Sequence, residues 1–235
     1  MNSIKTILIT RPLDQAKSLA KKLTQLNFKP IIFPAIEIHA INFDANINLN
    51  KFNMIIFVSP AAVIRFSSHI KTLPNHLKIF TIGEDSAALI KELGWTAPIH
   101  PYPHFSREAL LNLPEMQNVS QIPILIVEGK NGNNELATSL KLRGATVSQL
   151  LVYERMLPQP KQLPNLDTVD IVIATSEQSL NNLVLLLGPT IKDKILLVSS
   201  QKLVDLAASL GFTEKPLLAQ NAGDNAIIQA LPISA

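Results

Sequence analysis

The sequence repeats its own pattern once, at a constant offset of 117 residues. Ser59 corresponds to Ser176 and Gly94 to Gly211, and each pair stands at the same point of a strand–helix unit. Each half alternates short β-branched apolar runs with amphipathic helical stretches. Fully apolar strands that alternate with helices are typical of a parallel sheet covered on both faces. We therefore predict a bilobal α/β protein.

Two segments between the strand–helix units also match at this offset. They are residues 33–38 and 150–154, and prolines cluster beyond the second at Pro158, Pro160 and Pro164. Proline clusters outside regular elements are typical of hinges and linkers. We therefore expect the chain to cross between lobes at these two places.

Composition excludes several classes of protein. With no Cys, the 235-residue chain forms no disulfides and no thiolate zinc site, and 47% apolar residues exclude a disordered chain. Its apolar runs are shorter than the roughly 20 residues a bilayer needs, and the first residues lack the pattern of a signal peptide. The 21 basic and 18 acidic residues form no long basic run. We expect a cytoplasmic protein that binds neither membrane nor nucleic acid.

The predicted strand ends carry the candidate ligand-binding residues, because ligands bind outside the carboxyl ends of parallel strands. Hydroxyls, glycines and residues at helix N-termini dominate these positions, and such groups hold anions. The alternative is that the Ser and Thr residues are plain helix caps. The candidates are Thr10, Arg11, Ser59, Pro60, Ala61, Gly83, Ser86, Gly129, Lys130, Thr175, Ser176 and Ser200.

Two further side chains offer charge or proton chemistry. Arg11 could clamp a carboxylate with two hydrogen bonds, or form a surface salt bridge. Tyr153 lies in the second linker segment. Its phenol could point into a cleft as a weak acid, or its ring could fill a linker contact while the hydroxyl reaches water.

Metal, hydrolase and nucleotide sites are poorly supported. His100 and His104 are four residues apart, but Pro101 and Pro103 exclude the helix that would align them on one metal. No serine stands in a G-x-S-x-G turn, and the loop from Gly129 to Gly132 lacks a third glycine and a Walker Lys-Ser pair. We expect neither a metal nor a cofactor.

Several motifs, in order along the whole chain, resemble the uroporphyrinogen-III synthase family. They are Thr10-Arg11-Pro12 after a strand, Ser59-Pro60-Ala61, Gly83-Glu84-Asp85-Ser86-Ala87, Arg143-Gly144-Ala145 and Val152-Tyr153-Glu154-Arg155. The resemblance implies two parallel-sheet α/β lobes, flavodoxin- or Rossmann-like, joined by a two-stranded linker. One lobe would be residues 1–35 plus 156–235 and the other 40–149, with linker strands at 36–39 and 150–155.

The resemblance also implies the reaction: cofactor-free cyclisation of hydroxymethylbilane to uroporphyrinogen III, with inversion of ring D and loss of water. Tyr153 matches the family's cleft tyrosine and would assist departure of the hydroxyl, while Ser59 and Ser86 match two of its turn hydroxyls. The many carboxylates of this substrate suit a cleft of helix N-termini and hydroxyls. We expect a monomer, with transient contact to hydroxymethylbilane synthase left open.

The sequence departs from the family pattern at a few positions. Glu128 and Asn133 stand where many members have arginine, so a carboxylate clamp is lost unless Lys130 replaces it. Val58 and Leu203 stand where threonine is common. Two other hypotheses remain: a non-catalytic module that binds anionic small molecules on the same frame, and a nucleotide-dependent enzyme.

Overall fold

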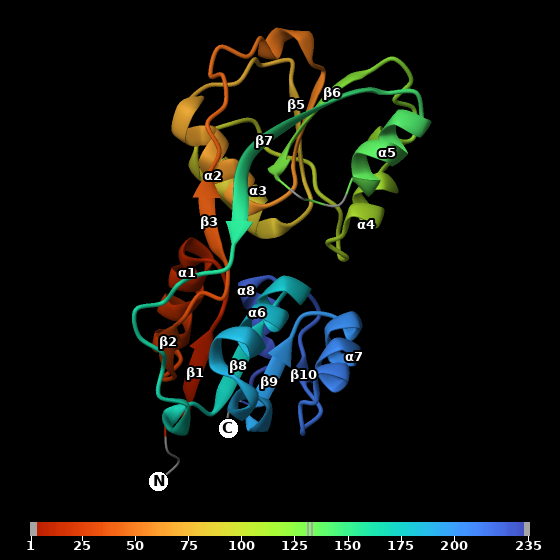
Figure 1. Ribbon diagram of the computed structural model, residues 1–235. Helices are drawn as coiled ribbons and strands as arrows, with labels where there is room; N and C mark the ends of the chain where they lie inside the picture. The colour runs from red at the N-terminus through yellow and green to blue at the C-terminus, as the bar shows by residue number, and fades with distance from the viewer. Residues whose placement is uncertain (1–3, 131, 133, 233–235) are drawn as a thin grey trace. The chain divides into compact units, whose positions relative to one another are not determined.

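The chain forms two compact units, each with its own sheet (Figure 1). The computed structural model describes residues 4–130, 132 and 134–232. One unit comprises the chain up to Glu37 together with the chain from Met156 onwards, and the other comprises Ile38–Arg155. The first is called unit 1 below, and the second unit 2.

Unit 1 contains a five-stranded sheet with the order β10-β9-β8-β1-β2, in which every neighbouring pair is parallel. The strands are β1 (Thr6–Ile9), β2 (Lys29–Ile32), β8 (Ile171–Ala174), β9 (Ile195–Val198) and β10 (Leu217–Leu218). The helical elements are α1 (Leu13–Gln25), η3 (Leu166–Thr168), α6 (Glu177–Leu187), η4 (Pro189–Asp193), α7 (Gln201–Leu210) and α8 (Asp224–Gln229).

Strand alternation sorts the core of unit 1 into two layers. Ile7 and Ile9 point to the face that α1 and α8 cover, and Leu8 points to the face that α6 and α7 cover. Because successive strand side chains face opposite ways, an apolar residue at every position requires cover on both faces. The fully buried strand β1 meets this requirement.

Unit 2 contains a second five-stranded sheet, with the order β3-β7-β6-β4-β5. The strands are β3 (Glu37–Ala40), β4 (Met54–Phe57), β5 (Lys78–Thr81), β6 (Pro123–Gly129) and β7 (Thr146–Met156). The helical elements are η1 (Leu49–Lys51), α2 (Pro60–His69), α3 (Glu84–Glu92), α4 (Arg107–Leu111), η2 (Pro114–Met116) and α5 (Glu135–Leu142). Helices α2 and α3 pack on one face, and α4 and α5 on the other.

The repeated halves exchange elements between the units. By the 117-residue offset, β6 corresponds to β1, β7 to β2, β4 to β8 and β5 to β9. The order β9-β8-β1-β2 of unit 1 is therefore the order β5-β4-β6-β7 of unit 2. Each unit thus combines the opening strand–helix–strand of one half with the later strands and helices of the other.

The predicted fold class is confirmed: two similar α/β units, each with a parallel-dominated sheet. The chain crosses between units at residues 37–38 and 155–156. Both crossing points lie within strands, β3 and β7, which are neighbours in the sheet of unit 2. No described helix has the length and apolar character needed to cross a membrane.

Candidate functional site

The carboxyl ends of three adjacent strands define a polar edge of unit 2. Phe57 at the end of β4 is in register with Thr81 of β5 and Val127 of β6. The segments that follow these strands therefore emerge at one edge. They bring Ser59 and Gly83 to this edge, where Gly129 is the last residue of β6.

Ser59 begins helix α2. Its Oγ accepts a hydrogen bond from the backbone N–H of Ala62 at 3.2 Å. Pro60 takes the first helical position, where its missing N–H costs nothing and its fixed φ suits the helix. Ser59, Pro60 and Ala61 are all partly exposed, so this helix start is open to a ligand. The cap and the candidate site are here the same residue.

Tyr153 places its hydroxyl against this helix start. Its oxygen lies 3.0 Å from Ser59 Oγ and accepts a second hydrogen bond, also 3.0 Å, from a terminal guanidinium nitrogen of Arg155. The guanidinium carbon of Arg155 lies 5.4 Å from the centre of the tyrosine ring. The Tyr153 ring is only 1% exposed and belongs to the core between the sheet and α2. The phenol is thus held inside unit 2, and its hydroxyl does not simply reach water.

Gly129 leaves the space that the tyrosine ring fills. The pairing of β6 with β7 shifts register at Glu128/Gly129, so Gly129 pairs with Tyr153. A Cβ at Gly129 would lie 2.5 Å from two ring carbons of Tyr153. The N–H of Lys130 donates to the Tyr153 carbonyl at 2.7 Å and extends the contact between the two strands by one residue. Any larger residue at position 129 must move the ring.

The start of α3 contributes a second helix N-terminus to this edge. Gly83 caps α3 in extended conformation, and its carbonyl accepts a hydrogen bond from the Thr81 hydroxyl at 3.2 Å. Gly83 is partly exposed, whereas Ser86, in the first turn, is buried with 2% exposure. Gly83 can therefore meet a ligand directly, while the Ser86 side chain is packed inside the unit.

The glycine loop after β6 carries charges of both signs. Glu128 is buried and accepts a 2.6 Å hydrogen bond from the side-chain amide of Gln149. The Lys130 ammonium is about half exposed and lies 3.5 Å from the carboxylate of Glu154. Asn133 is outside the described residues. Of the loop side chains that the structure describes, Lys130 is therefore the one cation placed to meet a carboxylate.

Arg11 lies where neither interpretation of the sequence put it. Its side chain is buried, and a terminal guanidinium nitrogen contacts Asp224 at 2.6 Å, while its Nε donates to Gln15 at 3.1 Å. It is neither a surface salt bridge nor an open carboxylate clamp. Thr10 is also buried, and its hydroxyl donates to the carbonyl of Ile173 at 2.7 Å. Both residues hold the end of β1 in place.

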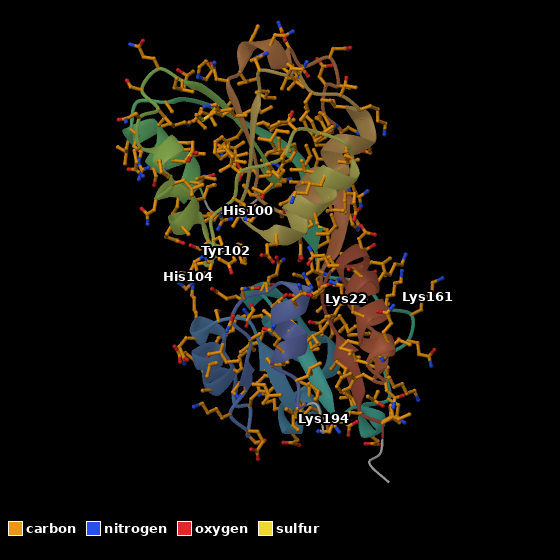
Figure 2. All side chains as sticks on the ribbon, turned by 180° about the vertical axis from the view of Figure 1, so that it is seen from behind. Lys22, His100, Tyr102, His104, Lys161 and Lys194 are labelled. Carbon is orange, nitrogen blue, oxygen red and sulfur yellow. The ribbon has the colours of Figure 1, made fainter. Side chains whose placement is uncertain are left out.

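Asp224 is the centre of a charge cluster at the start of α8. Besides Arg11, its carboxylate contacts Lys22 at 2.9 Å and accepts a hydrogen bond from Ser18 at 2.9 Å; Lys22 is labelled in Figure 2. Burial alone raises the pKa of Asp224, but the Lys22 and Ser18 hydrogen bonds and the Arg11 charge outweigh it and lower the pKa below its ordinary value. The carboxylate stays ionised and ties α1 to α8.

The remaining candidates surround two helix starts in unit 1. Ser176 caps α6 in a reciprocal arrangement with Ser179, and the Thr175 carbonyl accepts a hydrogen bond from Ser199 at 3.2 Å. Ser200 stands before α7 and is exposed, with no side-chain cap bond. Leu203, a departure from the family pattern, belongs to α7 and is buried in the core of unit 1.

The histidines do not form a metal site in the part of the chain that the structure describes. No group of three or more His, Asp or Glu residues there is arranged to hold an ion. His100 and His104 lie on one loop between α3 and α4, with Tyr102 between them (Figure 2). The rings of His100 and Tyr102 lie 6.0 and 6.3 Å from that of Phe105, measured between ring centres.

Sequence reasoning missed Arg155 as part of the site. Residues 153 and 155 lie two apart on strand β7, so both side chains project from the same face. That spacing is visible in the sequence and could have directed attention to Arg155. Conversely, the sequence contains no sign that Arg11 would pair with Asp224, which lies 213 residues further along the chain.

Comparisons with known proteins agree on one family. The family model described as uroporphyrinogen-III synthase HemD matches residues 17–228. The uroporphyrinogen-III synthases of Escherichia coli and Salmonella typhimurium are 26% and 28% identical to this chain, over 96% of it and 99% of each of them. That of Proteus mirabilis is 31% identical over 64% of this chain and 80% of its own.

Solved structures support the fold. The uroporphyrinogen-III synthetase of Helicobacter pylori aligns with a TM-score of 0.66 at 14% identity, covering 96% of this chain and 97% of its own. A mutant uroporphyrinogen III synthase of Thermus thermophilus aligns with a TM-score of 0.57 at 16% identity, covering 96% of both chains.

Proposed function

This chain belongs to the uroporphyrinogen-III synthase family of cyclising lyases in tetrapyrrole biosynthesis, and we propose that it converts hydroxymethylbilane to uroporphyrinogen III with inversion of ring D and loss of water. The observation that carries the assignment of its chemistry is the 3.0 Å contact between the Tyr153 hydroxyl and Ser59 Oγ. This contact brings the phenol hydroxyl to a partly exposed helix start.

The polar edge of unit 2 supports binding of a polycarboxylate. Ser59, Pro60 and Ala61 start α2, and Gly83 starts α3, so two positive helix ends emerge beside each other. Backbone N–H groups at such ends bind carboxylates without a buried positive side chain. Lys130 adds an exposed ammonium from the neighbouring loop. We assign this edge to the acidic side chains of the substrate.

The open helix starts of unit 1 suit the same ligand chemistry. Thr175 and Ser176 precede α6, and Ser200 precedes α7, and all three are at least partly exposed. We propose that they bind further carboxylates. In this proposal Thr10 and Arg11 have a structural part and do not bind substrate, because their polar atoms already hold β1 and α8.

The reaction demands orientation more than strong acid or base chemistry. Free hydroxymethylbilane closes to the isomer without inversion, so the enzyme must hold ring D in the orientation that leads to the inverted product. Fixing reacting groups in productive geometry can supply several kcal/mol of rate acceleration. Departure of the hydroxyl as water needs only a proton donor, and the Tyr153–Ser59 pair supplies one. The proposal therefore needs no cofactor.

We further propose a cytoplasmic monomer that receives its substrate by transient contact with hydroxymethylbilane synthase. The absence of a membrane-crossing helix among the described residues is compatible with this location. The instability of the substrate favours rapid transfer between the two enzymes.

The decisive experiment is an isomer assay. Freshly made hydroxymethylbilane is given to the purified protein without metal or nucleotide, and the oxidised products are separated by chromatography. The proposed function requires a predominance of isomer III. Isomer I alone, as in a reaction without protein, would contradict it; a separate binding titration would then test for a non-catalytic binding module.

A further inference from the structure

The Tyr153 ring is buried at 1% exposure, so the phenol does not meet a substrate at an open surface. Ser59, its partner at 3.0 Å, is partly exposed at the start of α2. We propose that Ser59 is the catalytic proton donor to the leaving hydroxyl, and that Tyr153 and Arg155 act through it as positioning residues. Tyr153 replaces the proton that Ser59 gives up, and Arg155 stabilises the negative charge that then forms on Tyr153. This inference rests on the proposed function and assigns the residues that carry out its first step.

Donor chemistry fixes the direction of two of the three hydrogen bonds around Ser59 and Tyr153. A guanidinium has no acceptor, so Arg155 donates to the phenol oxygen. The backbone N–H of Ala62 donates to Ser59 Oγ. When the phenol hydrogen also points at Ser59, both lone pairs of the serine oxygen are used. The hydrogen of Ser59 is then free to point away from Tyr153, towards the exposed side.

The proton balance of the step closes within these groups. Ser59 donates its proton to the leaving hydroxyl oxygen as the carbon–oxygen bond breaks, and water departs. The Tyr153 proton moves to Ser59 Oγ, which leaves a phenolate beside the Arg155 guanidinium. The substituted α-carbon of ring D attacks the cation left on the substrate, and a spiro intermediate forms. The bond between that carbon and the methylene bridge of ring C then breaks, and the released methylene cation bonds to the free α-carbon of ring D. The proton lost from that free α-carbon restores the aromatic pyrrole and returns through Ser59 to Tyr153.

Arg155 is placed to stabilise the phenolate. It donates directly to the oxygen that becomes charged, at 3.0 Å, and lies over the ring at 5.4 Å. When the phenol loses its proton, the guanidinium faces a negative charge instead of a neutral oxygen, so Coulomb attraction is added to the hydrogen bond. The contact therefore strengthens as the proton leaves, which is the requirement for lowering a barrier. Because Arg155 itself is exposed, its charge carries little burial cost.

The first test removes the Ser59 hydroxyl while sparing the helix. Ser59→Gly loses the hydroxyl at little cost to the helix cap, and Ser59→Thr keeps both hydroxyl and cap. We expect Ser59→Gly to lower kcat for isomer III about 100-fold and Ser59→Thr to restore most of it. Ser106→Gly is the matched control, because Ser106 caps α4 at 3.0 Å and has no contact with Tyr153.

The second test is a double-mutant cycle with Tyr153→Phe. Groups that act as one relay have strongly non-additive effects, so Ser59→Gly/Tyr153→Phe should be no slower than the slower single variant. Additive losses, or near-normal turnover by Ser59→Gly, would overturn the relay while leaving the synthase activity of the wild-type protein intact. Failure of the wild-type protein to form isomer III is a separate result, and it would overturn the proposed function itself.

The third test examines Arg155 through kcat, KM and the solvent isotope effect, because the loss of a merely structural residue would not change the isotope effect. We expect wild-type turnover to be slower in D₂O than in H₂O, because protons move in the relay. Arg155→Met should lower kcat with little change in KM and alter this isotope effect, and Arg155→Lys should restore part of kcat. An Arg155→Met enzyme with raised KM, normal kcat and an unchanged isotope effect would assign Arg155 to substrate binding instead.

Discussion

At the scale of single residues, the chemistry of this protein depends on close contacts between small and large side chains. Gly129 makes room for the Tyr153 ring, and that ring brings its hydroxyl to Ser59. The sequence contained the tyrosine, the serine and the glycine as separate candidates. It could not reveal that one of them exists to accommodate another, because the register shift between β6 and β7 that joins them is a property of the folded sheet.

Gly129→Ala should disrupt this arrangement. The added carbon would meet ring atoms at 2.5 Å in a buried site, so the ring or the strand must shift. Overpacking of this kind costs about 1–3 kcal/mol, and we also expect loss of isomer III formation as the phenol leaves Ser59. Urea unfolding and the isomer assay measure the two effects. In the unfolding experiment the control is Gly83→Ala, where the nearest atom would lie at 3.8 Å; equal stability losses in both variants would contradict the explanation.

Asp224→Asn should lower stability at neutral pH. The substitution removes the Asp224 charge that faces the buried Arg11 guanidinium at 2.6 Å, and removing one side of a buried ion pair costs about 3–5 kcal/mol. Since the folded state lowers the pKa of Asp224, the carboxylate stabilises the protein above its unfolded pKa of about 4, and that contribution is lost as pH falls through the folded value.

Urea unfolding at pH 7 and under acidic conditions checks the direction of this pH dependence. The stability difference between the wild-type protein and Asp224→Asn should shrink as the pH is lowered below about 4. Asp205→Asn serves as the control, because Asp205 is exposed on α7 and its carboxylate accepts a hydrogen bond from the neutral side-chain amide of Gln201. A difference that grows at low pH would contradict the assignment.

At the scale of elements, a residue at a helix start can cap the helix or bind a ligand, and the sequence could not separate these two functions. Ser59, Ser106 and Ser176 all cap helices through their side chains, as the plain interpretation of such residues predicts. Of these three, Ser59 is the one whose hydroxyl also contacts Tyr153. Elements and their order were predictable because hydrophobic periodicity is local, whereas the Arg11–Asp224 contact joins residues from opposite ends of the chain.

Ser176→Ala should destabilise unit 1 through α6. It removes a reciprocal cap in which Ser176 and Ser179 each bond to the other's backbone, and the loss of such a cap costs about 1 kcal/mol. Thermal unfolding of the variant should show this loss, while Ser176→Gly should be closer to wild type. If the alanine and glycine variants unfold alike, the cap geometry is not the cause.

At the scale of the whole molecule, the internal repeat does not coincide with the folded units. Each sheet takes strands from both halves of the sequence, so a half is not a domain. The fragment 38–155 contains all helices and nearly all strand residues of unit 2, while the fragment 1–117, of nearly equal length, contains only two-stranded pieces of either central sheet. Isolated two-stranded pieces are marginally stable at best.

We therefore expect fragment 38–155 to fold cooperatively and fragment 1–117 to remain largely unfolded. Circular dichroism and urea titration of the two purified fragments would measure the difference. A cooperative transition in fragment 1–117, with none in 38–155, would mean that the repeat, and not the unit, is the folding module.

The exchange of elements between units also sets an order of events during synthesis on the ribosome. Unit 2 is complete once residue 155 has emerged, but β1 must wait for β8, its neighbour in the sheet, which ends at Ala174. At typical rates of translation this wait lasts about ten to thirty seconds. Throughout that interval a strand that is fully buried in the finished protein has only β2 beside it and lacks its second neighbour. The N-terminal segment is thus the part of the nascent chain with most need of a chaperone.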